Sequence, residues 1–191
     1  MSRVLGIAGP YCSGKSTVAE ILQEWGWREI DVDALGHAAR KAKRREVVER
    51  FGTEDRSELR RIVFRDSEAL TDLEMILHPW MREEAKRRKE EILSKGGRVL
   101  INAALLFPMG LQEECDMVLW IDAPLPLRYL RARRRDGLGL GDFLMRIRSQ
   151  AKLYPQKERE SVDIITIVNL GSRRSLQRKL RRSLGDSRME M

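Results

Sequence analysis

Short apolar runs and helix-like apolar stripes alternate along this chain. Five apolar runs have the length of β-strands: residues 3–9, 27–33, 98–105, 116–123 and 163–169. After the first run, Val18, Ile21 and Leu22 recur at helical spacing, and Trp25 extends the same stripe. Strands separated by helices predict an α/β fold with a parallel five-stranded sheet and helices on both of its faces, which makes three layers.

One gap between the expected strands is too long for a single crossover helix. Residues 36–95 are helical in pattern almost throughout, with Gly52 and Pro79 as punctuation. We therefore expect an inserted helical subdomain there. The core would then comprise residues 1–35 and 96–191.

Two further helical segments follow in the second half of the chain. About residues 127–152, two helical patterns are broken at Asp136-Gly137. Near the end, Leu176, Leu180 and Leu184 are spaced by four and predict a terminal helix with one apolar stripe.

Composition places the chain in the ordinary globular class. It has 191 residues, 42% of them hydrophobic and 35% charged, enough for one core with a small insertion. No apolar run approaches a membrane span, and the start lacks a signal-peptide layout. Cys12 and Cys115 form neither a C-x-x-C pair nor a disulfide framework, so we expect a reducing cytoplasm.

A formal charge of +8 changes the picture, because it suits either nucleic acid or a polyanionic small-molecule substrate. Arginines cluster in three segments: residues 128–137, 146–152 and 172–182. The last cluster reads as the solvated face of the terminal helix. Against a nucleic-acid partner, aromatic residues make up only 6% of the chain and no nucleic-acid motif is present.

The first apolar run ends in the sequence GPYCSGKST, residues 9–17, which has the spacing G-x-x-x-x-G-K-[ST]. Gly9 and Gly14 permit a turn in which backbone N–H groups point at phosphate oxygens. Lys15 would reach the β- and γ-phosphates, and the Ser16 hydroxyl would ligate Mg²⁺. Because the motif lies between an expected strand and an expected helix, it predicts an ATP site of the P-loop type.

Two carboxylates follow the second apolar run. Asp31 and Asp33 are expected at the carboxyl edge of the sheet, the same edge as the glycine loop. Asp33 could accept the proton of an attacking hydroxyl, as a positioned base does in phosphoryl transfer. It could equally cap the helix that follows. Spacing alone leaves both roles open.

These segments resemble the dephospho-CoA kinase family. The motifs GPYCSGKSTVAEIL, IDVDALGHAAR, LHPWM, ALLFPMG, RRRDGL with RIRSQ, and VNLGS follow in the family's order, from about residue 3 to about residue 180. The resemblance implies a P-loop fold of the nucleoside-monophosphate-kinase type, with a helical acceptor-binding region at 36–95 and a lid at about 127–152. It also implies phosphorylation of the 3′-hydroxyl of dephospho-CoA by ATP, the last step of coenzyme A synthesis.

On the ATP side, the resemblance assigns the phosphates to the glycine loop. The residues concerned are Gly9, Cys12, Ser13, Gly14, Lys15, Ser16 and Thr17. Arg146 matches the arginine of the family's R-I-x-x-Q lid motif, and Arg131 and Arg135 rank next among the lid arginines. Asn169 falls in the loop that approaches the adenine.

On the acceptor side, Asp33 matches the catalytic aspartate of the family's I-D-x-D motif. His37 would share its helical face and meet an acceptor phosphate, or be a plain surface histidine. Arg56 matches the arginine of the CoA-binding helical region, and His78 matches the L-H-P turn, where it could be structural. Leu105, in the A-L-L-F segment, completes the expected acceptor contacts. The partners are then ATP and dephospho-CoA, without nucleic acid or membrane; the oligomeric state stays open, with a monomer favoured.

The chain departs from the family pattern at three places. The usual G-G-I-G-S-G-K becomes Gly-Pro-Tyr-Cys-Ser-Gly-Lys at residues 9–15, which puts Pro10 and Tyr11 beside the phosphates. The usual D-x-P-L-L-F-E becomes NAALLFP at residues 102–108. The segment between Gly52 and Arg56 is shortened. The last two changes fall on the acceptor side, so substrate choice is where this chain could differ.

Overall fold

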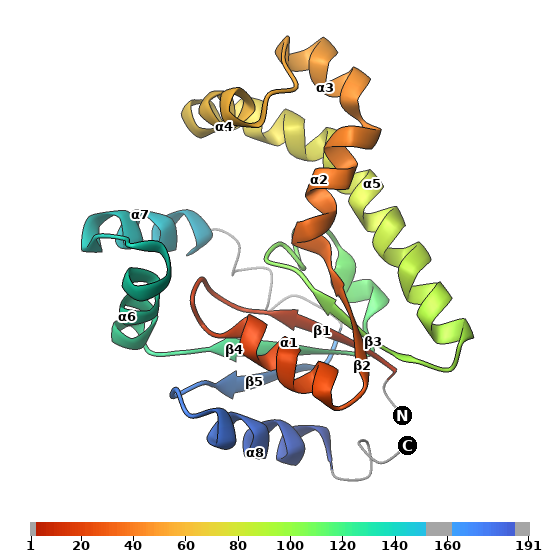
Figure 1. The fold of residues 1–191 in the computed structure, drawn as a ribbon, viewed down its shortest axis with the longest axis vertical. Helices are drawn as coiled ribbons and strands as arrows, with labels where there is room; N and C mark the ends of the chain where they lie inside the picture. The colour runs from red at the N-terminus through yellow and green to blue at the C-terminus, as the bar shows by residue number, and fades with distance from the viewer. Residues whose placement is uncertain (1–2, 152–161, 186–191) are drawn as a thin grey trace.

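A computed structural model describes residues 3–151 and 162–185. The five expected strands are present: β1 (Val4–Ala8), β2 (Trp27–Asp31), β3 (Arg98–Asn102), β4 (Met117–Asp122) and β5 (Ile164–Val168). They form one sheet in the order β2-β3-β1-β4-β5, with every neighbouring pair parallel. The predicted parallel sheet is confirmed (Figure 1).

Alternation along β1 divides the core between the two faces of the sheet. Leu5 and Ile7 pack on the face covered by α1 (Lys15–Glu24) and α8 (Arg173–Leu184). Val4 and Ala8 pack on the other face, where α5 (Ser67–Ser94) contributes Met81 and Ala85. Successive side chains of a strand point to opposite faces, so one strand serves both layers.

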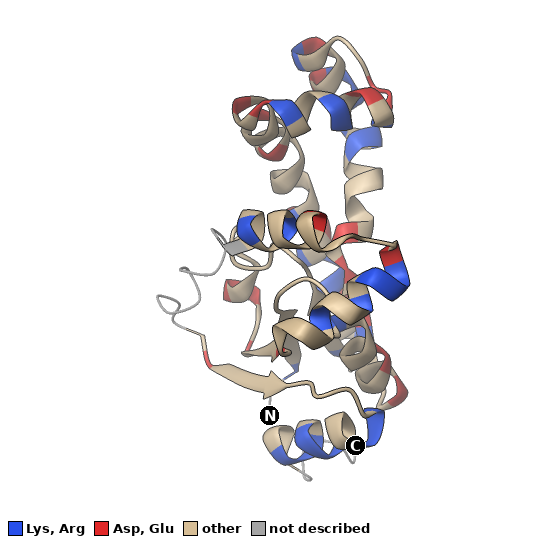
Figure 2. Ribbon diagram, turned by 90° about the vertical axis from the view of Figure 1, so that its left-hand side faces the viewer, with Lys and Arg blue, Asp and Glu red and all other residues tan. Residues whose placement is uncertain are grey.

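The terminal helix α8 is amphipathic as predicted. Leu176, Leu180 and Leu184 are buried, whereas Arg174, Arg178, Arg181 and Arg182 are exposed. In Figure 2 the helix at the foot of the molecule carries blue segments, the colour of Lys and Arg. Most of the arginines of this cluster therefore form a solvated face.

Four helices extend away from the sheet between β2 and β3: α2 (Val32–Ala42), α3 (Arg44–Phe51), α4 (Arg56–Arg65) and α5. In Figure 1, α3 and α4 lie at the top, and α2 and α5 connect them to the sheet. Gly52 ends α3 in the left-handed conformation, which agrees with the predicted break in the helical pattern at this residue.

Two expectations about this helical region are wrong. Residue 79 was expected to interrupt the helix as part of an L-H-P turn, but Pro79 lies inside the 28-residue helix α5. Packing of Leu77, Met81 and Ala85 against the core carries the helix through the proline. The expected strand at 27–33 ends at Asp31, and α2 begins at Val32, so the last two residues belong to the helix.

A helical pair follows β4 beyond the carboxyl ends of the strands (Figure 1). It consists of α6 (Leu125–Asp136) and α7 (Leu140–Ala151), separated by Gly137 in the left-handed conformation. A short 3₁₀ helix, η1 (Leu111–Glu114), precedes β4. Within residues 3–151 and 162–185, no helix combines the length and the apolar character needed to cross a membrane.

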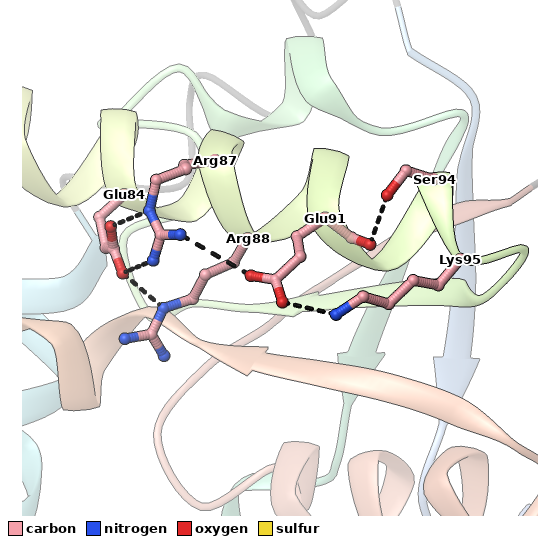
Figure 3. Close-up of polar contacts among 6 residues, drawn as sticks. All are labelled: Glu84, Arg87, Arg88, Glu91, Ser94 and Lys95. Atoms are coloured by element: carbon pink, nitrogen blue, oxygen red, sulfur yellow. Dashed lines mark hydrogen bonds and ion pairs between the residues drawn. The ribbon is translucent and has the colours of Figure 1, made fainter.

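Ion pairs line the exposed face of α5 (Figure 3). Glu84 accepts from Arg87 at 2.8 Å and from Arg88 at 2.7 Å, and Glu91 accepts from Lys95 at 2.7 Å. These pairs have the i, i+3 and i, i+4 spacing at which helical side chains meet. The two arginines lower the pKa of Glu84 to about 2. The pairs stabilise the C-terminal half of this long helix.

We expect Glu84→Gln to lower the free energy of unfolding by about 0.5–1 kcal/mol at pH 7, because it removes two partly exposed ion pairs. The carboxyl pKa is depressed in the fold, so this contribution is complete above pH 4.5 and is lost as the pH falls toward about 2. Urea unfolding of both proteins at pH 7 and pH 3 measures the difference. A gap that widens at pH 3 would contradict the assignment.

Candidate active site

The glycine loop joins β1 to α1, the context that its sequence pattern requires. Gly9 has φ +146°, and a Cβ there would lie 2.1 Å from the carbonyl oxygen of Ile121. Gly14 has φ +102°, and a Cβ there would lie 2.1 Å from Nδ2 of Asn169. Both positions therefore require glycine. Cys12, where the family pattern has glycine, adopts a left-handed φ of +60°.

Five consecutive loop carbonyls, residues 9–13, accept hydrogen bonds from side chains. Lys15 Nζ donates to Gly9 at 2.8 Å and to Pro10 at 3.2 Å. The remaining donors reach the carbonyls of residues 11–13: Arg128 Nε at 2.9 Å, Arg131 NH1 at 3.1 and 2.9 Å, and Asn169 Nδ2 at 2.9 Å. The loop thus has a fixed shape that its neighbours impose.

Arg128 and Asn169 are the buried members of this set, 6% and 5% exposed. Asn169, expected near the adenine, uses its amide to join Ser13 to the N–H of Gly171. Arg128 was missed, since nothing in a run of arginines marks one as buried. Its i, i+3 spacing from Arg131 was the available signal, because that spacing puts both on one face of α6.

The loop forms one wall of a cavity of about 740 Å³. The predicted site residues that line it are Cys12, Gly14, Lys15, Ser16, Thr17, Asp33, Arg131, Arg135 and Asn169. Tyr11, Asp31, Asn102, Ala104 and Gln150 line it as well. The glycine loop and the aspartate that follows β2 therefore meet in one cavity, as the shared sheet edge predicts.

Lys15 and Asp33 perturb each other across this cavity. Burial lowers the pKa of Lys15 to about 8, with Asp33 acting in the opposite direction. Burial also raises the pKa of Asp33, and Asp31 adds to that rise. The Ala104 N–H and Lys15 oppose it. Both groups are held closer to neutrality than in water.

The helix cap is Asp31, not Asp33. The Asp31 carboxylate accepts from the N–H of Ala34 at 3.0 Å, while Asp33 lies in the first turn of α2. The interpretation of Asp33 as the cap is therefore wrong, because α2 begins one residue after β2. The Asp33 side chain is left facing the cavity.

The Asp33 carboxylate accepts a hydrogen bond from the backbone N–H of Ala104, at 3.3 and 3.4 Å to its two oxygens. The family pattern has proline at this position, and proline has no N–H to donate. This chain therefore gives Asp33 a donor that the family pattern lacks. A hydrogen bond to the ionised carboxylate favours its charged form.

Apart from Asp33, the expected acceptor contacts lie outside this cavity. His37 is exposed and lies 3.4 Å from Arg40, and Arg56 is exposed at the start of α4. His78 lines a separate groove of about 640 Å³ beside Arg82 and Met109. Leu105 packs against the core.

Other expected residues also take different surroundings. The lid residue Arg146 does not line the cavity; its guanidinium lies 4.8 Å from the ring centre of Tyr11. Ser13 is fully buried, and its hydroxyl has no hydrogen-bond partner within the described part of the chain.

The described residues contain no group of three or more His, Cys, Asp or Glu side chains able to hold a metal ion. Ser16 is exposed on the cavity wall at the first turn of α1. The hydroxyl is an oxygen ligand of the kind that Mg²⁺ takes, and Mg²⁺ commonly completes its shell with phosphate oxygens and water.

Known proteins resemble this chain over most of its length. A family model described as dephospho-CoA kinase matches residues 3–175. Dephospho-CoA kinase of Thermus thermophilus is 36% identical, over 96% of this chain and 91% of its own length. That of Treponema denticola is 32% identical, over 93% of this chain and 86% of its own.

Solved structures agree in fold. TT1252 of Thermus thermophilus superposes with a TM-score of 0.76 at 35% identity, covering 96% of each chain. Dephospho-CoA kinase of Campylobacter jejuni gives 0.70 at 24% identity, covering 99% of this chain and all of its own. Shikimate kinase of Acinetobacter baumannii gives 0.56 at 18% identity over 98% and 96% of the two chains, which shows a shared P-loop kinase fold alone.

We expect Gly14→Ala to abolish nucleotide binding while the protein stays folded. The new Cβ would push the Asn169 amide off the Ser13 carbonyl, so the glycine loop would lose one of the contacts that fix its shape. The matched control is Gly52→Ala, which also has a positive φ, +71°, and has no atom within 4 Å of the added Cβ. The control loses about 1–2 kcal/mol of stability from backbone strain alone. Calorimetric titration with ATP compares the two; equal binding would contradict the steric argument.

Proposed function

We propose that this chain, which belongs to the dephospho-CoA kinase family, transfers the γ-phosphoryl group of ATP to the 3′-hydroxyl of dephospho-CoA, with Asp33 as the base. The observation that carries the proposal is the single cavity shared by the glycine loop, Lys15 and Asp33. A phosphate cradle alone would allow hydrolysis or regulation. A carboxylate facing that cradle supplies what transfer to an alcohol requires.

Asp33 would act on the acceptor hydroxyl. As the acceptor oxygen bonds to the γ-phosphorus, the hydroxyl proton passes to the Asp33 carboxylate, and the bond to the bridging oxygen breaks to release ADP. Burial raises the pKa of Asp33, which makes it a stronger base than an ordinary aspartate. The Ala104 N–H orients its carboxylate without removing its charge.

Lys15 and Ser16 would hold the nucleotide end of the reaction. The Lys15 ammonium now donates to the carbonyls of Gly9 and Pro10, a position from which it can turn to the β- and γ-phosphates. Ser16 would ligate Mg²⁺, which neutralises charge on the phosphates when bound. Donors placed where charge develops lower the barrier for transfer.

The lid arginines Arg131, Arg135 and Arg146 are proposed to offset charge on the transferring group. Arg135 lines the cavity and pairs with Asp136 at 2.9 Å. Arg131 lines it too, with one guanidinium nitrogen committed to the loop carbonyls. Asn169, which positions the loop, is proposed to lie close to the adenine.

The helical region at 36–95 is proposed to receive the acceptor. Its candidate contacts are His37, Arg56, His78 and, from the segment after β3, Leu105. The groove beside His78 lies next to Pro108 and Met109 of that same segment.

We also propose that the enzyme acts as a cytoplasmic monomer without nucleic acid. The positive net charge supports one alternative, an ATP-regulated nucleic-acid-binding protein. Measuring ATP turnover with dephospho-CoA, with nucleoside monophosphates and with DNA discriminates between the two functions.

We expect Asp33→Asn to bind ATP normally but to transfer phosphate at least ~10²-fold more slowly, because the amide cannot accept the proton. Folding should be unaffected, since Asp31 is the helix cap. Turnover with dephospho-CoA gives kcat, and titration with ATP provides the binding control. A folded variant with wild-type kcat would remove Asp33 from the mechanism.

We expect Ala104→Pro to shift the acid limb of the kcat–pH profile to higher pH. Loss of the N–H removes an influence that lowers the pKa of Asp33, so the base is protonated at higher pH and activity is lost earlier as pH falls. Ala104→Ser keeps the N–H and should retain the wild-type profile. Thermal melts establish that both variants fold. Superimposable profiles for the two variants would contradict the role of this hydrogen bond.

A further inference from the structure

Tyr11 of the glycine loop contacts both lid helices. Its N–H donates to Oε1 of Gln150 in α7 at 2.9 Å, and its carbonyl accepts from Nε of Arg128 in α6 at 2.9 Å. Its ring belongs to a small apolar cluster with Ala132 and Phe143. One loop residue thus joins the phosphate-binding loop to both helices of the lid.

The Tyr11 ring also gathers two lid arginines. The guanidinium carbon of Arg135 lies 5.2 Å from the ring centre and that of Arg146 lies 4.8 Å from it, both within cation–π range. Arg135 comes from the end of α6, whereas Arg146 comes from the middle of α7. The ring is where arginines from these two helices meet.

The Tyr11 hydroxyl completes the arrangement. It donates to Oδ2 of Asp136, and the same carboxylate accepts from Nε of Arg135 at 3.0 Å and from NH2 at 2.9 Å. Arg135 and Tyr11 lower the pKa of Asp136 to about 2, so this carboxylate stays ionised. Asp136 therefore anchors both the ring and one arginine.

We propose that Tyr11 is a positioning residue that holds the guanidinium groups of Arg135 and Arg146 beside the glycine loop for phosphoryl transfer. Stacking occupies the face of a guanidinium and leaves the N–H donors at its edge free of the ring. In Arg135, Nε and NH2 donate to Asp136, so its other N–H groups are the ones available to phosphate oxygens. Arg135 already lines the cavity together with Tyr11. The inference rests on the proposed kinase function and concerns the placement of its lid.

Tyrosine at position 11 distinguishes this chain from the family pattern. The family pattern has isoleucine at the position of Tyr11, and an aliphatic side chain offers no π-face to a cation. Isoleucine is nevertheless a side chain that a loop of this family accommodates. Tyr11→Ile therefore removes the stacking in a form suited to the fold, and Tyr11→Phe keeps the ring and removes only the hydroxyl.

We expect Tyr11→Ile to lower kcat about 5- to 10-fold, the loss expected for two weak cation–π contacts, with the KM for dephospho-CoA unchanged. Tyr11→Phe should stay within about twofold of the wild type, since its ring still stacks. Steady-state kinetics at saturating ATP measures both. A Tyr11→Ile variant with wild-type kcat, or a Tyr11→Phe variant as slow as Tyr11→Ile, would overturn the proposal.

A double-mutant cycle separates positioning from a merely structural role. If Tyr11 acts through the arginines, Tyr11→Ile should cost less in an Arg146→Ala background than in the wild type. Losses in kcat that simply multiply would overturn the proposal, because they would mean that Tyr11 acts independently of Arg146.

A measurement that needs no catalysis tests the positioning role of Tyr11 separately from the proposed kinase function. Hydrogen exchange of the α7 amides in the free protein should accelerate in Tyr11→Ile and not in Tyr11→Phe. Failure of the wild type to phosphorylate dephospho-CoA would refute the function while the exchange result still tested the contact. Unchanged exchange in Tyr11→Ile would refute the positioning role.

Discussion

The site depends on one constraint: five successive loop carbonyls, residues 9–13, are each held by a side chain. Their donors come from three separate parts of the chain, namely α1, α6 and the segment after β5. The sheet order brings these parts together, because β1 lies between β3 and β4, and β5 flanks β4. Gly14 has to lack a side chain so that Asn169 can reach the loop. The phosphate cradle is thus a property of the whole core.

The charges of the site follow from sharing one partly enclosed cavity. Burial disfavours the ionised form of both Lys15 and Asp33, and each favours the ionised form of the other. An aspartate with a raised pKa binds a proton more strongly, while the nearby ammonium keeps it ionised. The burial that shifts both pKa values would therefore tune Asp33 for its proposed role as the base. The hydrogen bond from the Ala104 N–H, which the family pattern lacks, lowers the pKa of Asp33.

Hydrophobic periodicity predicted the five strands, the helical insertion and the paired helices at about 127–152, because apolar side chains recur in each at the spacing of its secondary structure. The glycine loop was predictable from its spacing, since only glycine permits its backbone angles at residues 9 and 14. Sequence could not decide whether Asp33 is a base or a helix cap, because the answer depends on where β2 ends and α2 begins. The roles of Tyr11 and Arg128 were equally hidden, since their contacts lie more than 100 positions away in the chain.

Helix α5 holds the outer helices α3 and α4 far from the sheet. At 1.5 Å per residue its 28 residues span ~42 Å, so a tilt of ~10° at the sheet end would carry the far end through ~7 Å. Pro79 leaves the carbonyl of Met75 without its helical donor, which makes the rod most compliant about 18 Å from that far end. Bending there would carry α3 and α4 with the outer end, while Ala85, Ile92 and Leu93 keep the other end packed against the core.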